Sequence, residues 1–282
     1  MSDFGNIMLW NGDAQIKTWL APDCNKVFGT DGTAFAPNVK RDTVLTIFNP
    51  ELCRRLSMIY EKDELHEGIP IYRFEMSRTF FDPAAEENQC YCWPPKPRYC
   101  GYNGTFVVKR CKFGSPIALS KPHFLGGHPS LMNFGGISPD PIDHDSYMKI
   151  VPKLGIPVSV KLRLQINLMI SRRVRTFKEF KNIKDMTFPV FWFETGMDSL
   201  PQHLVTQLKM AVVYPELVRW TAGGLLVTTS MILAFASTVY MLKTSAQSPD
   251  VTEVKAAAQE DRKSLIGFSK SNDVDGEIHT PF

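Results

Sequence analysis

An unbroken run of 23 uncharged residues, Trp220 to Leu242, lies between Arg219 and Lys243 and constrains this chain more than any other feature. As a helix rising about 1.5 Å per residue, the run is roughly 34 Å long, enough to cross a hydrocarbon core of about 30 Å. The aromatic rings near its ends suit the headgroup level of a bilayer. The sequence therefore predicts one transmembrane helix over residues 219–243.

The six cysteines of the chain all precede this run. They are Cys24, Cys53, Cys90, Cys92, Cys100 and Cys111. An even number clustered on one side of a span is typical of disulfides formed in an oxidising compartment. Zinc is the alternative, but the spacings do not follow the usual C-x₂-C pattern and no histidine partner follows the cysteines tightly. Spacing alone permits 15 disulfide pairings and does not choose among them.

An N-glycosylation acceptor occurs within the cysteine-rich region, at Asn103-Gly104-Thr105. A weak excess of Lys and Arg after the span indicates that the residues after it are cytoplasmic, which agrees with a cysteine-rich region on the other side. We therefore expect residues 1–218 to be extracellular or luminal and residues 244–282 to form a disordered cytoplasmic tail.

The first residues after Met1 have neither the basic n-region nor the apolar h-region of a signal peptide. A chain whose only span comes late would have to translocate all of residues 1–218 ahead of it. We therefore expect an upstream targeting segment to be missing, so that the protein is single-pass as given and two-pass if its N-terminus is incomplete.

The coarse pattern of residues 1–218 is β-rich with a few helices. Apolar and polar residues alternate from Val158 to Ile170, which predicts a long strand with one apolar and one mostly polar face, suited to an antiparallel sheet or barrel wall. Shorter strands are predicted over residues 69–74, 105–110 and 188–193. The fold class is therefore α+β and β-rich, followed by one transmembrane helix.

Two helices are predicted in the same region. Asn49 can cap the first, Pro50 fits its first turn, and apolar residues from Leu52 to Tyr60 recur at helical spacing. The second is expected from Ser199 to Val213, with Pro215 breaking the approach to the span.

Several functional classes are disfavoured. A formal charge of +3 is too mild to imply nucleic-acid binding. Ser115 does not lie in the G-x-S-x-G elbow of a hydrolase, and His123 and His144 lack metal-ligand spacing, so ordinary structural histidines are expected. We therefore expect neither an enzyme nor a cofactor.

A basic stretch follows the long strand. Its members are Arg172, Arg173, Arg175, Lys178, Lys181 and Lys184. It could attract anionic phospholipid or another polyanion, although a solvated strand edge and turn is the favoured interpretation.

Small residues recur on one face of the span, at Ser230, Ala234 and Thr238. Such spacing lets helices approach closely, so this face could dock another membrane helix or a second copy in a homo-oligomer.

The tail carries an acidic dileucine pattern, with Asp261 four positions before Leu265 and Ile266. Clathrin adaptor proteins bind such motifs in disordered tails, so the pattern points to endosomal or lysosomal routing.

Local sequences over about 220 residues resemble the class B scavenger receptor family in their order along the chain. The matching stretches are residues 29–32, 53–56, 68–74, 90–92, 114–117, 120–125, 164–167 and 189–194, followed by the span. The resemblance implies an antiparallel β-barrel ectodomain anchored by a membrane helix at each end. It also implies the pairings Cys24–Cys90, Cys53–Cys111 and Cys92–Cys100.

The resemblance further implies an apolar tunnel that passes fatty acids, sterols or lipid from lipoprotein particles towards the bilayer, at the plasma membrane. The residues that line such a tunnel are not specified by the sequence. Two alternatives are a lysosomal or endosomal trafficking receptor for a luminal protein and a sensory co-receptor for hydrophobic odorants. Relative to the family pattern, the first membrane helix and the front half of the ectodomain are absent here.

Overall fold

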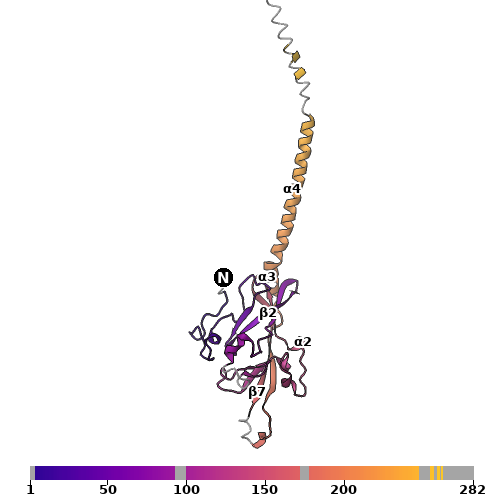
Figure 1. The fold of residues 1–282 in the computed structure, drawn as a ribbon. Coiled ribbons are helices and arrows are strands. Elements are labelled where there is room, and N and C mark those ends of the chain that lie inside the picture. Colours follow the sequence, from indigo (N-terminus) through magenta and orange to yellow (C-terminus); the bar gives the residue numbers. More distant parts are fainter. Residues whose placement is uncertain are drawn as a thin grey trace, which may run out of the picture. The chain divides into compact units, whose positions relative to one another are not determined.

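The computed structural model describes residues 4–92, 100–171 and 178–247, together with 255–256, 259–260 and 262. The chain divides into two compact units, Met1–Pro215 and Glu216–Phe282. The first holds the sheet and its short helices, and most of the long helix α4 lies in the second (Figure 1).

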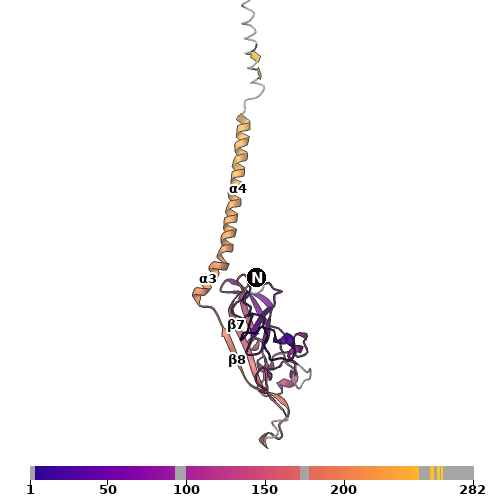
Figure 2. The same cartoon turned by 90° about the vertical axis from the view of Figure 1, so that its left-hand side faces the viewer.

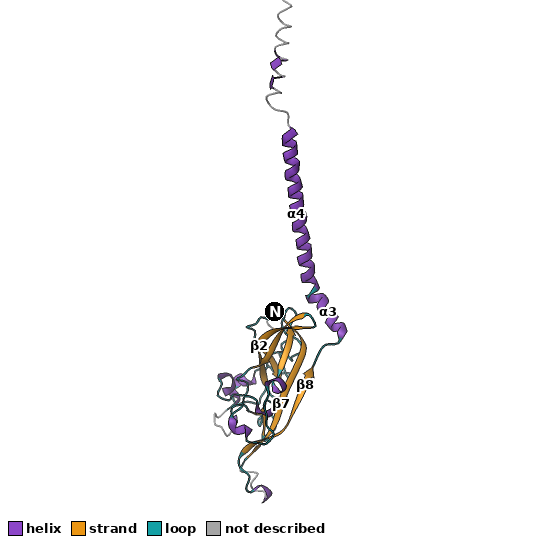
Figure 3. Cartoon of the chain, turned by 90° about the vertical axis from the view of Figure 1, so that its right-hand side faces the viewer, coloured by secondary structure: helices purple, strands orange, loops and turns teal. Residues whose placement is uncertain are grey.

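The first unit is built on one antiparallel sheet of eight strands in the order β1-β2-β3-β6-β7-β5-β4, with β8 paired to β7 (Figure 3). The strands are β1 Leu45–Asn49, β2 Arg54–His66, β3 Ile69–Met76, β4 Phe106–Val107, β5 Ile117–Ser120, β6 Tyr147–Val151, β7 Ile156–Ile170 and β8 Met186–Met197. Short 3₁₀ helices are η1 Pro22–Asn25, η2 Glu86–Tyr91, η3 Pro122–Phe124, η4 Pro129–Met132 and η6 Lys178–Phe180. The α-helices are α2 Pro141–His144, α3 Gln202–Val212 and α4 Tyr214–Gln247.

Strand β7 joins the parts of this sheet. Along one edge it pairs first with β6 and then with β5, and along the other edge it pairs with β8 over residues 160–170 (Figure 2). The structure confirms the strand predicted over residues 158–170 and begins it two residues earlier. The predicted short strands correspond to β3, β4 and β8, of which β4 is shorter than expected.

The helix predicted after Asn49 is wrong, because the chain forms a β1–β2 hairpin there. The Asn49 side chain, expected to cap a helix, instead accepts a hydrogen bond from the backbone N–H of Leu52 within the turn. Cys53 has a φ of 50°, which ends the turn in a left-handed conformation. Beyond it Leu56 and Met58 are buried at the period of a strand, and this burial on the sheet outweighs the helical spacing.

The sheet is packed on both faces. On one face Leu56, Phe74 and Leu164 belong to the larger apolar core, which also contains Trp19 and Phe106. On the opposite face of β3 the side chains of Ile69 and Ile71 are buried, and they pack with Val205 and Leu208 of α3. The predicted helix over residues 199–213 is therefore present as α3, and it covers one end of the sheet.

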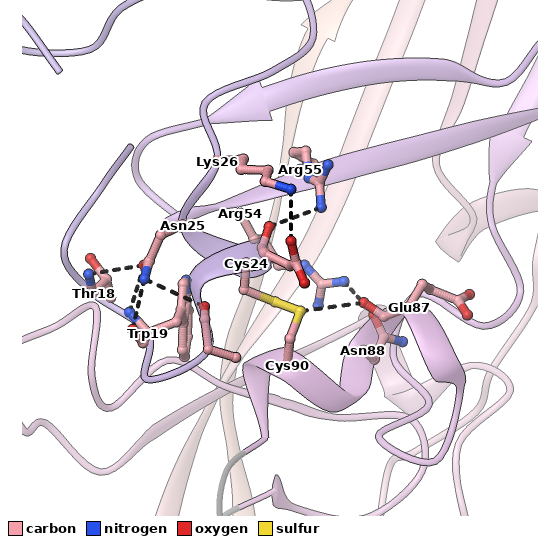
Figure 4. Close-up of a disulfide and its surroundings, with 12 residues drawn as sticks. Thr18, Trp19, Cys24, Asn25, Lys26, Arg54, Arg55, Glu87, Asn88 and Cys90 are labelled. Atoms are coloured by element: carbon pink, nitrogen blue, oxygen red, sulfur yellow. Dashed lines mark hydrogen bonds and ion pairs between the residues drawn. A yellow bond between two sulfur atoms is a disulfide. The ribbon is translucent and has the colours of Figure 1, made fainter. Parts of the chain in front are cut away.

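A buried arginine lies at the centre of the larger core. The Arg54 guanidinium stacks on the rings of Phe80, Tyr91 and Phe106, with 3.9, 4.4 and 4.3 Å from its carbon Cζ to the ring centroids. It donates to the Phe80 carbonyl and, at 2.7 Å, to Asn88 Oδ1 (Figure 4). Burial lowers the pKa of Arg54 to about 10, so the group stays charged at neutral pH.

Helix α4 is the one helix among the described residues that is long and apolar enough to span a membrane. Its 34 residues correspond to about 51 Å. Hydroxyl groups in its apolar part, such as those of Thr229, Ser230 and Thr238, donate to carbonyls one turn earlier in the same helix. These polar groups are thus satisfied within the helix, as a hydrocarbon environment requires.

We call Arg54, the rings of Phe80, Tyr91 and Phe106, and Asn88 the Arg54 cage. The cage gives a prediction about stability. Arg54→Ala removes three ring contacts and leaves the Asn88 amide oxygen without its donor, so we expect the free energy of unfolding to fall by about 3 kcal/mol. Urea unfolding of the full chain in detergent, followed by tryptophan fluorescence, measures this loss. The control Arg55→Ala removes a partly exposed side chain with a 3.4 Å hydrogen bond to the Asp23 carbonyl, and should cost less than about 0.5 kcal/mol. Equal losses in the two variants would contradict the role of the cage.

Candidate functional site

An apolar surface extends from the core onto β7 and β8. Because residues opposite each other in an antiparallel pair share a face, Leu164 lies beside Phe193 and Ile166 beside Phe191. Leu164 is 3% exposed, whereas Phe191 is 53% exposed and Phe193 37% exposed. The rings of Phe191 and Phe193 are 6.4 Å apart, as expected for neighbours on one face. We call this surface, with Leu168 at its end, the β7–β8 apolar face.

The sheet does not close into a barrel within the described residues. Strand β8 pairs with β7 along one edge, and its other edge has no strand beside it in the part of the chain that the structure describes. The ladder shifts register at Val190, where β8 has one residue more than β7. The exposed aromatic side chains of β8 therefore lie at an open border of the sheet.

The polar face of β7 is buried. Ser159, Arg163, Gln165 and Asn167 are each at most 8% exposed. Residues 121–146, which include η3, η4 and α2, contact this face, and we call them the covering segment. Asn167, the most deeply buried, donates to the Ser120 hydroxyl and accepts from the Gln165 amide, so this polar surface is an internal hydrogen-bond network.

An ion-pair network fixes the covering segment to β7 and β8. The Arg163 guanidinium donates to Glu194 Oε2 at 2.7 Å and to the carbonyls of Ile142 and Asp145. Lys161 Nζ is 2.9 Å from the other Glu194 oxygen. The hydrogen bond from Lys161, followed by that from Arg163, lowers the pKa of Glu194 from its ordinary value. Glu194 is therefore a charged anchor at neutral pH.

The disulfides join Cys24 to Cys90 (Figure 4), Cys53 to Cys111 and Cys92 to Cys100, the same three pairs that the resemblance implies. All six sulfur atoms are therefore in crosslinks, which leaves no thiolate to bind zinc. The bridges gather η1, the β1–β2 turn and η2 around the Arg54 cage. A cavity beside Arg54 measures about 20 Å³, which holds about one water molecule and no lipid.

Asn103 of the predicted glycosylation acceptor is exposed in the loop before β4. Its carbonyl accepts the backbone N–H of His128, and Thr105 is 2% exposed with its hydroxyl bonded to the Tyr102 carbonyl. The loop thus presents the Asn103 side chain to solvent while its backbone is held in place.

Part of the basic stretch and the tail motif lie outside the described residues. These are Arg172, Arg173 and Arg175 of the stretch, and Asp261, Leu265 and Ile266 of the motif. Lys178, Lys181 and Lys184 are described and exposed. Both functional assignments stay predictions.

Sequence reasoning missed one pair of side chains that the fold brings together. His123 of η3 and His144 of α2 stack with 4.3 Å between ring centroids. They are 21 positions apart on separate short helices, so no local spacing in the sequence predicts their contact. The phenylalanines of β8 were predicted as part of a strand, and their position on an exposed apolar face also comes from the structure.

Comparison with known proteins decides the family. The model of the CD36 family matches residues 1–241, most of the chain. The chain belongs to the CD36 family. This agrees with the resemblance to class B scavenger receptors drawn from the local sequences.

Individual relatives within the CD36 family come from mammals and insects. Scavenger receptor class B member 1 of Cricetulus griseus is 29% identical over 265 residues, which cover 93% of this chain and 50% of that protein. Sensory neuron membrane protein 2 of Aedes aegypti is 28% identical over 87% of this chain and 48% of its own length. Lysosome membrane protein 2 of Mus musculus is 30% identical over 74% and 43%. The chain thus spans about half the length of the curated relatives it matches.

The disulfides give a second prediction. In the chain-entropy treatment a bridge stabilises more when it closes a longer loop, and the sequence separations are 58 for Cys53–Cys111 and 8 for Cys92–Cys100. Replacing both cysteines of the first pair by serine should lower the free energy of unfolding by about 4 kcal/mol, and the second pair by about 2.5 kcal/mol. Urea unfolding of the full chain without reductant measures both values. A larger loss for the short loop would contradict the entropic origin of the stabilisation.

Proposed function

We propose that this protein is a membrane scavenger receptor that binds lipid non-covalently on the β7–β8 apolar face and passes it towards the bilayer. The observation that carries the proposal is the exposure of Phe191 and Phe193 on a surface continuous with the apolar core. Membership of the CD36 family supports it.

The chemistry of the face suits an acyl chain or a sterol. Its side chains are aliphatic and aromatic, and the charged anchors Arg163 and Glu194 lie on the opposite face of the same two strands. Each methylene that leaves water for such a surface contributes about 0.8 kcal/mol. A flexible chain laid along β7 and β8 therefore gains affinity in proportion to its length.

An enclosed lipid tunnel needs further strands, because the described sheet is open at β8. The outer edge of β8 offers unpaired backbone groups and exposed aromatic rings, which further strands of a barrel would cover. In this proposal the β7–β8 apolar face is one wall of the tunnel that the family resemblance implies, and α4 anchors the unit at the membrane.

The domain arrangement is part of the same proposal. Residues 1–218 are placed outside the cell or in a lumen, residues 219–243 in the membrane, and residues 244–282 in the cytoplasm. Disulfides in the first unit support this orientation, because they persist in oxidising compartments. The acidic dileucine pattern at Asp261, Leu265 and Ile266 supports endosomal or lysosomal routing as the alternative to the plasma membrane.

Lipid binding can be tested at the apolar face. Phe191→Glu places a charge where the proposal has an acyl chain, so affinity for a long-chain fatty acid should fall by about tenfold or more. The measurement is equilibrium binding of a photoactivatable fatty acid to the full chain in nanodiscs, with the crosslinked peptide identified by mass spectrometry. Label should map to residues 186–197.

Phe113→Glu is the matched control, because Phe113 is fully exposed in a turn before β5, outside the β7–β8 apolar face. This substitution should leave fatty-acid affinity unchanged. If both variants bind as tightly as the native chain, or if label maps elsewhere, lipid does not use this face.

The orientation gives its own prediction. In cells that secrete glycoproteins, the chain expressed behind a signal peptide should carry one N-glycan at Asn103, removable by an endoglycosidase with a gain in gel mobility. Asn103→Gln should migrate like the enzyme-treated native chain, and Asn11→Gln, in a site without the acceptor pattern, should not. An unglycosylated native chain would place residues 1–218 on the cytoplasmic side or outside the secretory pathway.

A further inference from the structure

Two stacked histidines connect the covering segment to the polar face of β7 and β8. The rings of His123 and His144 lie 4.3 Å apart between centroids, with 24° between their planes. His144 is 8% exposed, and its ring meets the indole of Trp192 edge to face at 5.8 Å. These two ring contacts bring together η3, α2 and β8.

The hydrogen bonds of both rings define their protonation state. His123 Nδ1 accepts the backbone N–H of Ser138 at 3.0 Å, and His144 Nδ1 accepts that of Asp140 at 2.8 Å. A backbone N–H only donates, so each Nδ1 must carry a free lone pair and each ring must be neutral. A proton on either Nδ1 would face another N–H, and two imidazolium rings at this distance would repel.

The backbone of His123 adopts a conformation that is unfavourable for a residue with a side chain. Its φ is 52°, a left-handed conformation that residues other than glycine adopt infrequently. The backbone N–H of His123 donates to Gln165 Oε1 of β7 at 2.7 Å, which fixes η3 on the sheet. Loss of the ring contacts would therefore remove a restraint on a strained turn.

The surrounding charges face the pair from four elements. Asp140 and Asp143 of α2 and its cap favour a charged His144, whereas Arg163 of β7 and the neighbouring His123 oppose it. Burial is the largest effect, and together with His123 it lowers the pKa of His144. The ion pairs Lys121–Asp145 and Arg163–Glu194 lie beside the pair.

We propose that His123 and His144 form a proton-operated latch, which holds residues 121–146 on the polar face of β7 and β8 at neutral pH and releases them in an acidic compartment. Release would expose the buried polar side chains of β7 and the part of Trp192 that His144 contacts. The latch operates whether or not the opposite face of the two strands binds lipid.

The direction of the pH dependence follows from proton linkage. The pKa of His144 in the folded protein lies below its ordinary value of 6.5, so just below pH 6.5 the native state binds fewer protons than the open state. The contribution of the latch is present in full above this pH. It is lost as the pH falls through 6.5 towards the lower pKa of the folded protein.

Hydrogen–deuterium exchange of the full chain in nanodiscs tests the latch. Between about pH 7.5 and about pH 5.5, after correction for intrinsic exchange rates, peptides from residues 121–146 should lose about tenfold in protection. Peptides from β2 and β3 should keep theirs. Unchanged protection of residues 121–146 in the native chain overturns the proposal without recourse to any variant.

His144→Asn and His128→Asn form a matched pair. Asparagine keeps an acceptor near the position of Nδ1 but does not titrate, so His144→Asn should reduce the acid response of residues 121–146 to less than about twofold. His128 also accepts a backbone N–H, from Ser130, but it stacks on Tyr102 away from the pair, so His128→Asn should respond like the native chain. A full acid response in His144→Asn, or its loss in His128→Asn, assigns the opening to other groups and overturns the latch.

Discussion

The backbone ladder of β7 is the constraint on which the rest of the first unit depends. This 15-residue strand pairs with β6, β5 and β8, and its two faces contact different parts of the unit. Leu164 and Ile166 extend the core on one face, while Arg163 and Gln165 bind the covering segment on the other. A shift of one residue in register would exchange the two faces, burying charge in the core and exposing its aliphatic side chains.

The sequence predicted β7 well because strand periodicity is a local property that its alternating residues display in full. The residues after Asn49 satisfy two periods at once, since Leu52 and Leu56 are four apart and Leu56 and Met58 are two apart. Pairing of β2 with β1 and β3, which no local pattern encodes, decides in favour of a strand. The same limit applies to His123 and His144, whose contact exists only after η3 and α2 have both packed on β7.

The Arg54 cage shows how an interior so rich in aromatic rings accommodates a positive charge. Three ring faces and two oxygen acceptors replace part of the water that the guanidinium loses on burial, and its Nε is buried without a hydrogen-bond partner. A cysteine pattern read alone leaves 15 possible frameworks, whereas the cage explains why these particular bridges suit the fold: they converge on the segments that supply its walls. Charge, rings and crosslinks thus form one structural unit.

The distribution of the crosslinks also divides the first unit mechanically. Every bridge lies between Cys24 and Cys111, so β6, β7, β8 and α3 have no covalent tie other than the backbone itself. Tension transmitted along α4 enters this part first, through α3 and the end of β8. A force on α4 is therefore resisted there by non-covalent contacts alone, first those of α3 with Ile69 and Ile71 and then the β7–β8 ladder, whereas the segments around Arg54 are also held by three bridges.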